Sequence, residues 1–307
     1  MQCRSNSSGS SRGGRINDHS SVARVNGDPL SDTGSWDLES SISAAVDAWG
    51  VLEDEYAEGY GAFNSLPFQI LGTSANDIAC HPHVLSPPLM ESLQNFLPPS
   101  ISDNNFWLKY SLVRDGASLP SLLRNIRGTR RTFIAIETVE GEVFGSFTSV
   151  PWRKNWNYFG NGESFLWRMR RSRCEKDAQH SILDQAKLES ELEVYYWSGR
   201  NNLVQYCTHD MLAVGGGLLR DENRDDLPDK QPDMGGFGLA IDSDLLRGTS
   251  SPCATFQSPP LSKLHSNGSP FEILNMEVWT LTPCNSVAEA ENIEMTALFL
   301  ETYNREH

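Results

Sequence analysis

The run Val194-Tyr195-Tyr196-Trp197-Ser198-Gly199-Arg200-Asn201 indicates how this chain folds. Branched and aromatic side chains favour a strand, and the Ser-Gly pair that follows favours a tight turn. Four later runs repeat the combination: Gly215-Gly216-Gly217, Gly235-Gly236-Phe237-Gly238-Leu239, Ser250-Ser251-Pro252-Cys253-Ala254-Thr255-Phe256 and Glu277-Val278-Trp279. In this order they predict aromatic-rich strands joined at glycine corners. None of them is a catalytic signature.

The size and composition of the chain fit one large domain or two smaller ones. Its 307 residues can build a sizeable core, but a hydrophobic content of 38% indicates that part of the chain adds nothing to that core. No apolar run approaches the roughly 18 residues that a membrane span needs. Residues 1–15 lack the apolar stretch of a secretory signal.

The six cysteines are far apart and form no CxxC pair. Without a secretory signal they are expected to be buried thiols of a reducing compartment. We therefore expect an intracellular location, cytoplasmic in the first place, with nucleus and mitochondrion left open.

The net charge of −15 is distributed unevenly. Residues 31–63 contain eight acidic residues and no Lys or Arg, whereas residues 101–173 contain 12 basic and 6 acidic residues. Nucleic-acid binding is disfavoured, because attraction to phosphates needs a dominant positive face. The basic region is either a site for an acidic partner or an ordinary solvated surface.

The composition divides the chain into four parts. Residues 1–38 are expected to be disordered, and residues 39–83 form an acidic, partly helical lead-in. The main domain follows at 84–281, with surface insertions near 170–192 and 218–233, and 282–307 is a C-terminal tail with a helical pattern. In the lead-in, a candidate helix either packs on the domain or folds on a partner; its apolar residues are Ile42, Ala45, Val46 and Trp49.

Within the main domain the spacing of apolar residues changes from the 3.6-residue period of a helix to the two-residue period of a strand. Ser86 can cap a helix that begins with Pro87-Pro88 and ends at Pro98-Pro99, and a second helix is expected from Ser118 to Gly128. Strands are then predicted at 132–139, 143–147, 165–167, 194–197, 238–241 and 271–281. The expected fold class is α+β: a mainly antiparallel β-sandwich of two sheets with a few flanking helices.

These runs, in their order, resemble the TLDc domain that the oxidation-resistance proteins share. Earlier stretches extend the resemblance: Leu85 to Leu89, Leu97-Pro98-Pro99, Tyr110-Ser111-Leu112, Gly116 to Leu122, Val143 to Phe147 and Tyr158 to Leu166. The resemblance covers about residues 84–281. It assigns structural roles to the signature residues Gly145, Gly160, Gly162, Glu163, Trp197, Gly199, Asn201, Gly215, Gly216, Gly217, Gly236, Phe237, Gly238, Ser251, Cys253, Phe256, Glu277 and Trp279.

The resemblance implies a non-enzymatic regulatory module in protection against oxidative stress. Some members of the family bind the V1 sector of the vacuolar proton-pumping ATPase, so a protein partner of that kind is expected here. No cofactor and no metal are implied. The entry helix, the loops and the tail, with Ile293, Ala297 and Leu300 at helical spacing, are the expected contacting parts.

One stretch departs from the family pattern. Where members have "sYFinGD", this chain has Leu203 to Asp210, and only Asp210 aligns. We therefore expect partner specificity to lie on an atypical surface, which comprises Cys207-Thr208-His209, the two insertions and the tail.

Three motifs carry weak chemical signals. The glycine runs 215–217 and 235–238 lack the context of a dinucleotide or phosphate loop, so tight strand corners are favoured. Cys253 has no recognisable His partner nearby, and a structural thiol is favoured over a nucleophile. Cys80-His81-Pro82-His83 holds three potential metal ligands, but no second cluster completes a site.

Glu163 is the most interesting polar residue, because the resemblance places an acid between Gly162 and an aromatic strand. As a catalytic acid or base it would need a nearby partner, for which Asp210, Asp244 and Glu277 are candidates. The structural alternative is that Glu163 accepts backbone N–H bonds at the turn. The competing function is therefore an enzyme, either a thiol-dependent peroxide scavenger or a hydrolase centred on Glu163. Simple consumption of oxidant by exposed cysteines is a third hypothesis.

Overall fold

The computed structural model describes residues 67–74, 82–174, 187–217 and 236–306. Several expectations fall outside these ranges. They are the disorder of residues 1–38, the lead-in helix around Ile42 to Trp49, the Cys80-His81 pair and the insertion at 218–233.

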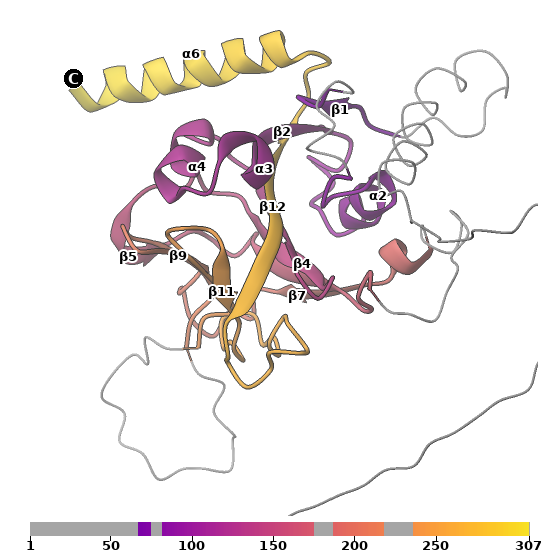
Figure 1. Cartoon of the computed structure of the whole chain (residues 1–307). Helices are drawn as coiled ribbons and strands as arrows, with labels where there is room; N and C mark the ends of the chain where they lie inside the picture. Colours follow the sequence, from indigo (N-terminus) through magenta and orange to yellow (C-terminus); the bar gives the residue numbers. More distant parts are fainter. Residues whose placement is uncertain (1–66, 75–81, 175–186, 218–235, 307) are drawn as a thin grey trace, which may run out of the picture.

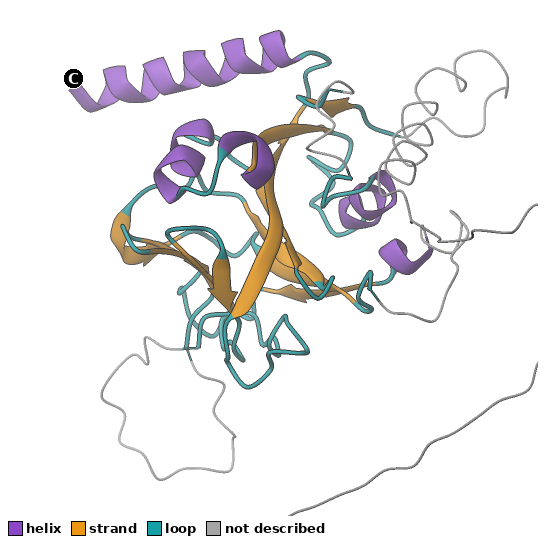
Figure 2. Ribbon diagram, in the orientation of Figure 1, coloured by secondary structure: helices purple, strands orange, loops and turns teal. Residues whose placement is uncertain are grey.

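The fold is a large antiparallel sheet assembly with a few helices, as expected for the α+β class (Figures 1 and 2). The strands are β1 Ile70–Leu71, β2 Asn105–Ser111, β3 Thr132–Thr138, β4 Val143–Thr148, β5 Asn155–Phe159, β6 Phe165–Met169, β7 Leu192–Tyr196, β8 Gln205–Cys207, β9 Met211–Val214, β10 Leu239–Asp242, β11 Arg247–Thr249 and β12 Phe271–Thr282. The helices with fully described bounds are α2 Pro87–Gln94, α3 Leu112–Asp115, α4 Leu119–Asn125 and α6 Val287–Glu306.

The long strand β12 joins two sheets. The strand order is β5-β8-β9-β10-β11-β12-β3-β4-β6-β7, and β2 pairs with β12 beside this path. The first residues of β12 pair with β11, and its later residues pair with β2 and β3. The only parallel pairing among the described strands is that of β1 with β2. Because β12 runs through both sheets, the two halves of the sandwich share one continuous strand.

Two hydrophobic cores lie on opposite faces of the central strands. Alternate residues of β3 separate into them: Ile134 and Ile136 face the β8–β10 sheet, whereas Phe133 and Ala135 belong to the core beneath α2. This separation follows from the two-residue period of a strand. In the second core the rings of Phe133, Phe147 and Phe165 are in contact, with centroids 4.9 to 6.2 Å apart. The central strands are therefore buried on both faces.

The two expected helices are confirmed, although the first is shorter than expected. The Oγ of Ser86 accepts the N–H of Leu89 at 3.4 Å, and Pro87 and Pro88 occupy the first turn of α2. That helix ends at Gln94, four residues before Pro98. Helix α4 follows Ser118, and Gly128 after it has a positive φ of 77°.

The predicted insertion at 170–192 overlaps a regular hairpin. The N–H of Arg170 donates to the carbonyl of Glu191, and Leu192 already belongs to β7, where it pairs with Met169. Residues 187–190 form a helical turn. The ends of this segment are therefore part of the β6–β7 ladder, because backbone pairing continues beyond the aromatic residues that mark the strands in the sequence.

Helix α6 follows β12 and crosses the outside of the domain above α4 (Figure 1). Its inner side contacts the domain at three positions one turn apart: Ala290 is buried with Trp107, the carboxylate of Glu294 accepts from Lys109 at 2.7 Å, and Leu298 lies against Gly128. Val287 packs against the same cluster as Ala290, and the other described apolar side chains of the helix are exposed.

Gly145 offers a direct test of the central packing. A Cβ atom at this position would lie 1.8 Å from the carbonyl oxygen of Ile134 on the neighbouring strand. We expect Gly145→Ala to lower the free energy of unfolding by about 3 kcal/mol, because the backbone must move. Gly116→Ala is the control, since open space surrounds Gly116 and only its positive φ of 81° opposes a side chain, at a cost of about 1 kcal/mol. Urea unfolding followed by tryptophan fluorescence measures both; equal losses would contradict the packing.

Candidate functional site

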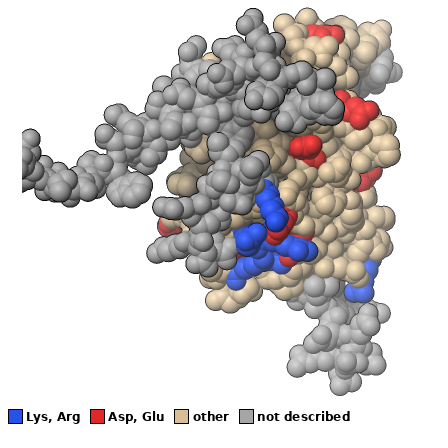
Figure 3. Space-filling model, turned by 90° about the vertical axis from the view of Figure 1, so that its right-hand side faces the viewer, with Lys and Arg blue, Asp and Glu red and all other residues tan. Residues whose placement is uncertain are grey.

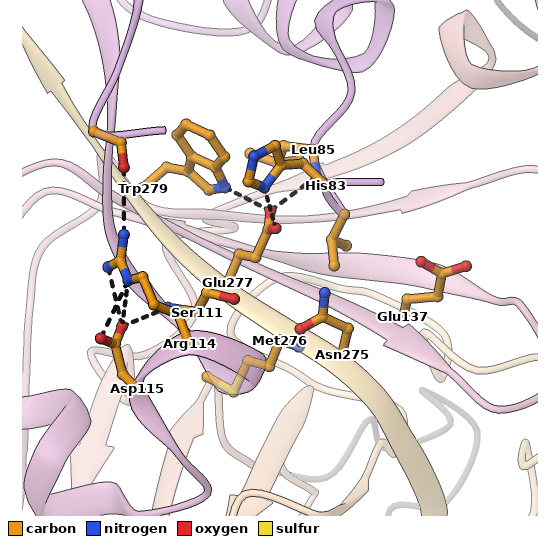
Figure 4. Close-up of polar contacts among 12 residues, drawn as sticks. His83, Leu85, Ser111, Arg114, Asp115, Glu137, Asn275, Met276, Glu277 and Trp279 are labelled. Carbon is orange, nitrogen blue, oxygen red and sulfur yellow. Dashed lines mark hydrogen bonds and ion pairs between the residues drawn. The ribbon is translucent and has the colours of Figure 1, made fainter. Parts of the chain in front are cut away.

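A buried carboxylate on β12 fixes the start of the domain to the sheet. Glu277 has no solvent exposure, and its carboxylate oxygens accept the indole N–H of Trp279 at 2.8 Å and the backbone N–H of Leu85 at 3.2 Å. The Nδ1 of His83 lies 2.7 Å from the same carboxylate (Figure 4). A buried carboxylate needs such donors, because burial without them is very costly.

The guanidinium of Arg173 is a second charged group that contacts the residues after His83. It donates to the carbonyl of Val84 at 2.9 Å and pairs with Glu137 at 2.9 Å and with Glu189 at 3.2 Å. Glu189 also accepts the hydroxyl of Ser86, which is the N-cap of α2. We call this set the entry network; it consists of His83, Val84, Leu85 and Ser86 with Glu137, Arg173, Glu189, Glu277 and Trp279.

The geometry of the entry network supports anchoring rather than proton transfer. Both oxygens of Glu277 are engaged by donors, which leaves its carboxylate little capacity to accept a proton from a substrate. A His–carboxylate pair can orient a catalytic histidine, but catalysis also needs a nucleophile on the other ring nitrogen. The described contacts of His83 include those with the carboxylate of Glu277 and the ring of Trp279.

The arginines near the β6–β7 hairpin are paired with acidic groups. Arg168 pairs with Glu193 at 2.6 Å, and Arg171 lies 3.5 Å from Glu191. Burial opposes ionisation of Glu193, but hydrogen bonds from Tyr195 and Arg168 outweigh it and lower the pKa of this carboxyl. Lys and Arg atoms gather beside acidic atoms on the face drawn in Figure 3. This paired surface is unlike the uncompensated positive face that nucleic acid needs.

Glu163 lies apart from all the carboxylates suggested as its partners. It is exposed in the turn before β6, and Asn161 holds it: the Asn161 amide donates to its carboxylate at 3.5 Å and accepts its backbone N–H at 3.2 Å. In the described chain no hydrogen bond or ion pair joins Glu163 to Asp210, Asp244 or Glu277. The expected backbone donors are also missing from its contacts, because the Asn161 side chain takes their place.

Cys253 is a buried thiol inside a packed hairpin. Its Sγ lies 3.5 Å from the carbonyl oxygen of Gly216, and a Cβ on Gly215 would lie 2.5 Å from the same sulfur. Burial raises the pKa of the Cys253 thiol, and burial likewise raises the pKa of Cys207 to about 11. Both remain protonated at neutral pH and are therefore poor nucleophiles.

Backbone N–H groups at the glycine corner 215–217 form hydrogen bonds within the protein. The N–H of Gly216 donates to the hydroxyl of Thr255 at 3.0 Å, and the N–H of Gly215 donates to a backbone carbonyl at 2.8 Å. The same Thr255 hydroxyl contacts the side chain of Asn201 at 2.7 Å, and the carbonyl of Asn201 accepts the indole N–H of Trp197 at 2.7 Å. These donors are not directed at a phosphate; they join the signature runs to one another.

The expectation that Cys207-Thr208-His209 forms an atypical surface is wrong for two of its three residues. Cys207 and Thr208 are buried, because Cys207 points between the sheets and Thr208 closes the β8–β9 turn. Only His209 is exposed, where it lies 3.1 Å from the Nζ of Lys154. Within the described ranges no group of three or more His, Cys, Asp or Glu side chains is placed to bind a metal ion.

Comparison with known proteins places the chain in a family. The model of the TLDc domain matches residues 80–282, which is most of the chain and includes the whole entry network. The chain belongs to the TLDc domain family. The match begins just before His83 and ends with β12, so the helix α6 lies beyond the family domain.

Relatives of this TLDc protein carry names from two groups. The proteins called Oxidation resistance protein 1 from Podospora anserina and Saccharomyces cerevisiae are 31% and 29% identical to it. These matches cover 70% and 64% of this chain, and 64% and 72% of the relatives. Nuclear receptor coactivator 7 from Gallus gallus is 27% identical over 65% of this chain, but over only 18% of its own length.

Among the described parts of this TLDc protein, no helix has both the length and the apolar character that crossing a membrane requires.

Removing the charge of Glu277 tests the entry network. Glu277→Gln keeps the side-chain shape but turns one acceptor into a donor that faces N–H groups. We expect a loss of about 2–4 kcal/mol in the free energy of unfolding. The matched control is Glu163→Gln, which changes an exposed side chain and should stay within about 0.5 kcal/mol of the wild type. A similar small effect of both substitutions in urea unfolding would contradict the anchoring role.

Thiol labelling tests the placement of the cysteines. Of the four described cysteines, only Cys174 is exposed, whereas Cys207, Cys253 and Cys284 are buried. We expect N-ethylmaleimide at pH 7.5 to modify Cys174 in the native protein, and Cys207 and Cys253 more than about a hundredfold more slowly, since little thiolate forms there. Peptide mass spectrometry identifies the sites. Modification of Cys253 as fast as Cys174 in folded protein would restore the thiol-enzyme hypothesis.

Proposed function

We propose that this TLDc protein is a non-enzymatic interaction module that contributes to protection against oxidative stress in an intracellular compartment. The names of its relatives from Podospora anserina and Saccharomyces cerevisiae support the link to oxidation resistance. The partner that we propose is the V1 sector of the vacuolar proton-pumping ATPase, as the resemblance to the family implies.

One observation carries the non-enzymatic part of the proposal: the candidate catalytic groups are used for folding or lie alone. The Cys253 thiol is buried with a raised pKa, and the Glu277 carboxylate is occupied by three donors. Glu163 is exposed, and within the part of the chain that the structure describes no second carboxylate or histidine contacts it. A proton-transfer or nucleophilic mechanism needs two such groups within hydrogen-bonding distance.

The surface that favours an interaction role is the outer side of α6. Five large apolar side chains on this helix are between 52% and 69% exposed; they are Ile293, Met295, Phe299, Leu300 and Tyr303. Contiguous exposed apolar groups of this kind mark interaction sites in most proteins. The expected anchor Ala297 is exposed beside them, whereas Ala290 and Leu298 face the domain.

Binding to purified V1 sector tests the partner. We expect the full chain to bind immobilised V1 sector, and Phe299→Ser to weaken that binding roughly tenfold, because a buried aromatic anchor contributes 1.4 kcal/mol or more. Leu264→Ser is the matched control, since Leu264 is equally exposed on a loop away from α6. Failure to bind at low and at physiological salt, both by the wild-type chain and by a variant with Asp47→Asn, Glu53→Gln, Asp54→Asn and Glu55→Gln, would refute the proposed partner.

A protection assay separates the interaction module from the enzyme. Cells that depend on this protein for survival in hydrogen peroxide should be protected equally by the wild type and by Glu163→Gln and Cys174→Ser. Cys253→Ser should also protect, provided that thermal unfolding shows the domain to be folded. Loss of protection in a folded variant of either cysteine, or of Glu163, would establish chemistry at that residue and overturn the non-enzymatic assignment.

A further inference from the structure

The outer side of α6 is an exposed apolar face. The side chains of Ala290, Glu294 and Leu298 lie on the inner side, where they contact Trp107, Lys109 and Gly128. At 3.6 residues per turn the five exposed apolar residues lie on the remaining surface. We call this surface, formed by Ile293, Met295, Phe299, Leu300 and Tyr303, the α6 face.

Three exposed arginines lie on α4 and on the turn after it, which α6 crosses. The carboxylate of Glu294 accepts from Thr129 at 3.0 Å, and Leu298 contacts Gly128, so this turn lies directly beneath the helix. Arg124, Arg127 and Arg131 are exposed, and among the described residues none of them forms an ion pair. In this respect they differ from the paired arginines of the β6–β7 hairpin. These arginines place positive charge next to α6, whose own sequence contains five Glu and one Arg.

The same chain contains a segment with the complementary chemistry. Residues 31–63 carry eight acidic residues without a single Lys or Arg. Between these charges Ile42, Ala45, Val46 and Trp49 recur at helical spacing. An acidic amphipathic segment supplies apolar side chains for the α6 face and carboxylates for Arg124, Arg127 and Arg131.

The described chain begins close to the α6 face. Leu71 of β1 pairs with Trp107 and packs in the cluster that contains Trp107, Cys284 and Ala290 at the start of α6; Figure 1 shows β1 beside that end of the helix. The eight residues from 63 to 71 can span up to about 26 Å, and α6 is about 30 Å long. A segment tethered at this distance has an effective concentration in the millimolar range.

Two other occupants fit less well. The acidic insertion 218–233 leaves the fold beyond Val214 and Leu239, which pair at one end of β9 and β10. The other end of β10 meets α4, where the N–H of Leu119 donates to the carbonyl of Ser243, so the insertion starts at the far end. A second copy has no tether to α6, whereas the acidic segment belongs to the same chain and has the higher effective concentration.

We propose that the acidic segment 31–63 binds the α6 face of its own chain and screens it from other partners. The contact combines apolar burial along α6 with pairing of the segment's carboxylates to Arg124, Arg127 and Arg131. It is an intramolecular interaction whose strength falls as salt rises. The proposal stands independently of the identity of any external partner.

Hydrogen–deuterium exchange of the full chain tests this proposal. One variant neutralises four carboxylates of the segment: Asp47→Asn, Glu53→Gln, Asp54→Asn and Glu55→Gln. The matched control neutralises four in the insertion: Asp221→Asn, Glu222→Gln, Asp225→Asn and Asp226→Asn. We expect the amides of residues 293–303 to exchange roughly fivefold faster in the first variant and at the wild-type rate in the control. Arg127→Ala with Arg131→Ala should reproduce the first result.

Three outcomes overturn the proposal. Exchange at the wild-type rate in the first variant shows that the segment does not protect α6. Equal acceleration in the control shows a general charge effect. Protection that depends on protein concentration identifies a second copy as the occupant. As an independent measurement, a fluorescein-labelled peptide of residues 36–63 should bind the first variant at least about tenfold more tightly than the wild type, whose α6 face is occupied; equal affinity contradicts occupation.

Discussion

A carboxylate that is buried in an apolar core needs hydrogen-bond donors. The donors to Glu277 come from the start of the domain and from β12, and the arrangement of this domain depends on these contacts. Glu277 sits on β12, the strand common to both sheets, and contacts His83, Leu85 and the indole of Trp279. The start of the domain is therefore fixed to its last strand. Arg173 completes the arrangement, because it holds Val84 and pairs with the acid that contacts the N-cap of α2.

The same principle explains why the signature residues are poor candidates for chemistry. At the corner around Thr255, hydroxyl, amide and indole groups satisfy one another and the glycine N–H groups. The Cys253 thiol is enclosed by this corner. Polar groups that are fully satisfied inside a fold define its geometry and leave no capacity for a substrate. The function that we propose therefore depends on what the scaffold presents at its surface, above all on α6, which lies beyond the family domain.

Local patterns in the sequence predicted local structure well. The Ser86 cap, the proline-led helix and the alternation along β3 and β4 all follow from side-chain chemistry within a few residues. The strands β1, β2, β5, β8, β9 and β11 were not predicted. Most of them are short, and β5 pairs with β8, far along the chain, although β8 and β9 are neighbours in sequence. The contact between His83 and Glu277 joins positions 194 residues apart, which no spacing rule reveals. For the same reason the sequence singled out Glu163, because of the residues next to it, whereas in the structure the buried carboxylate is that of Glu277.

The coupling between His83 and Glu277 is the quantity on which this account depends most directly. A double-mutant cycle with His83→Ala, Glu277→Gln and the double variant measures it through the free energy of unfolding in urea. We expect the two single losses to exceed the loss in the double variant, with a coupling of about 2 kcal/mol, because either substitution alone leaves a buried partner without its contact. Additive losses, within about 0.5 kcal/mol, would show that the pair does not join the start of the domain to β12.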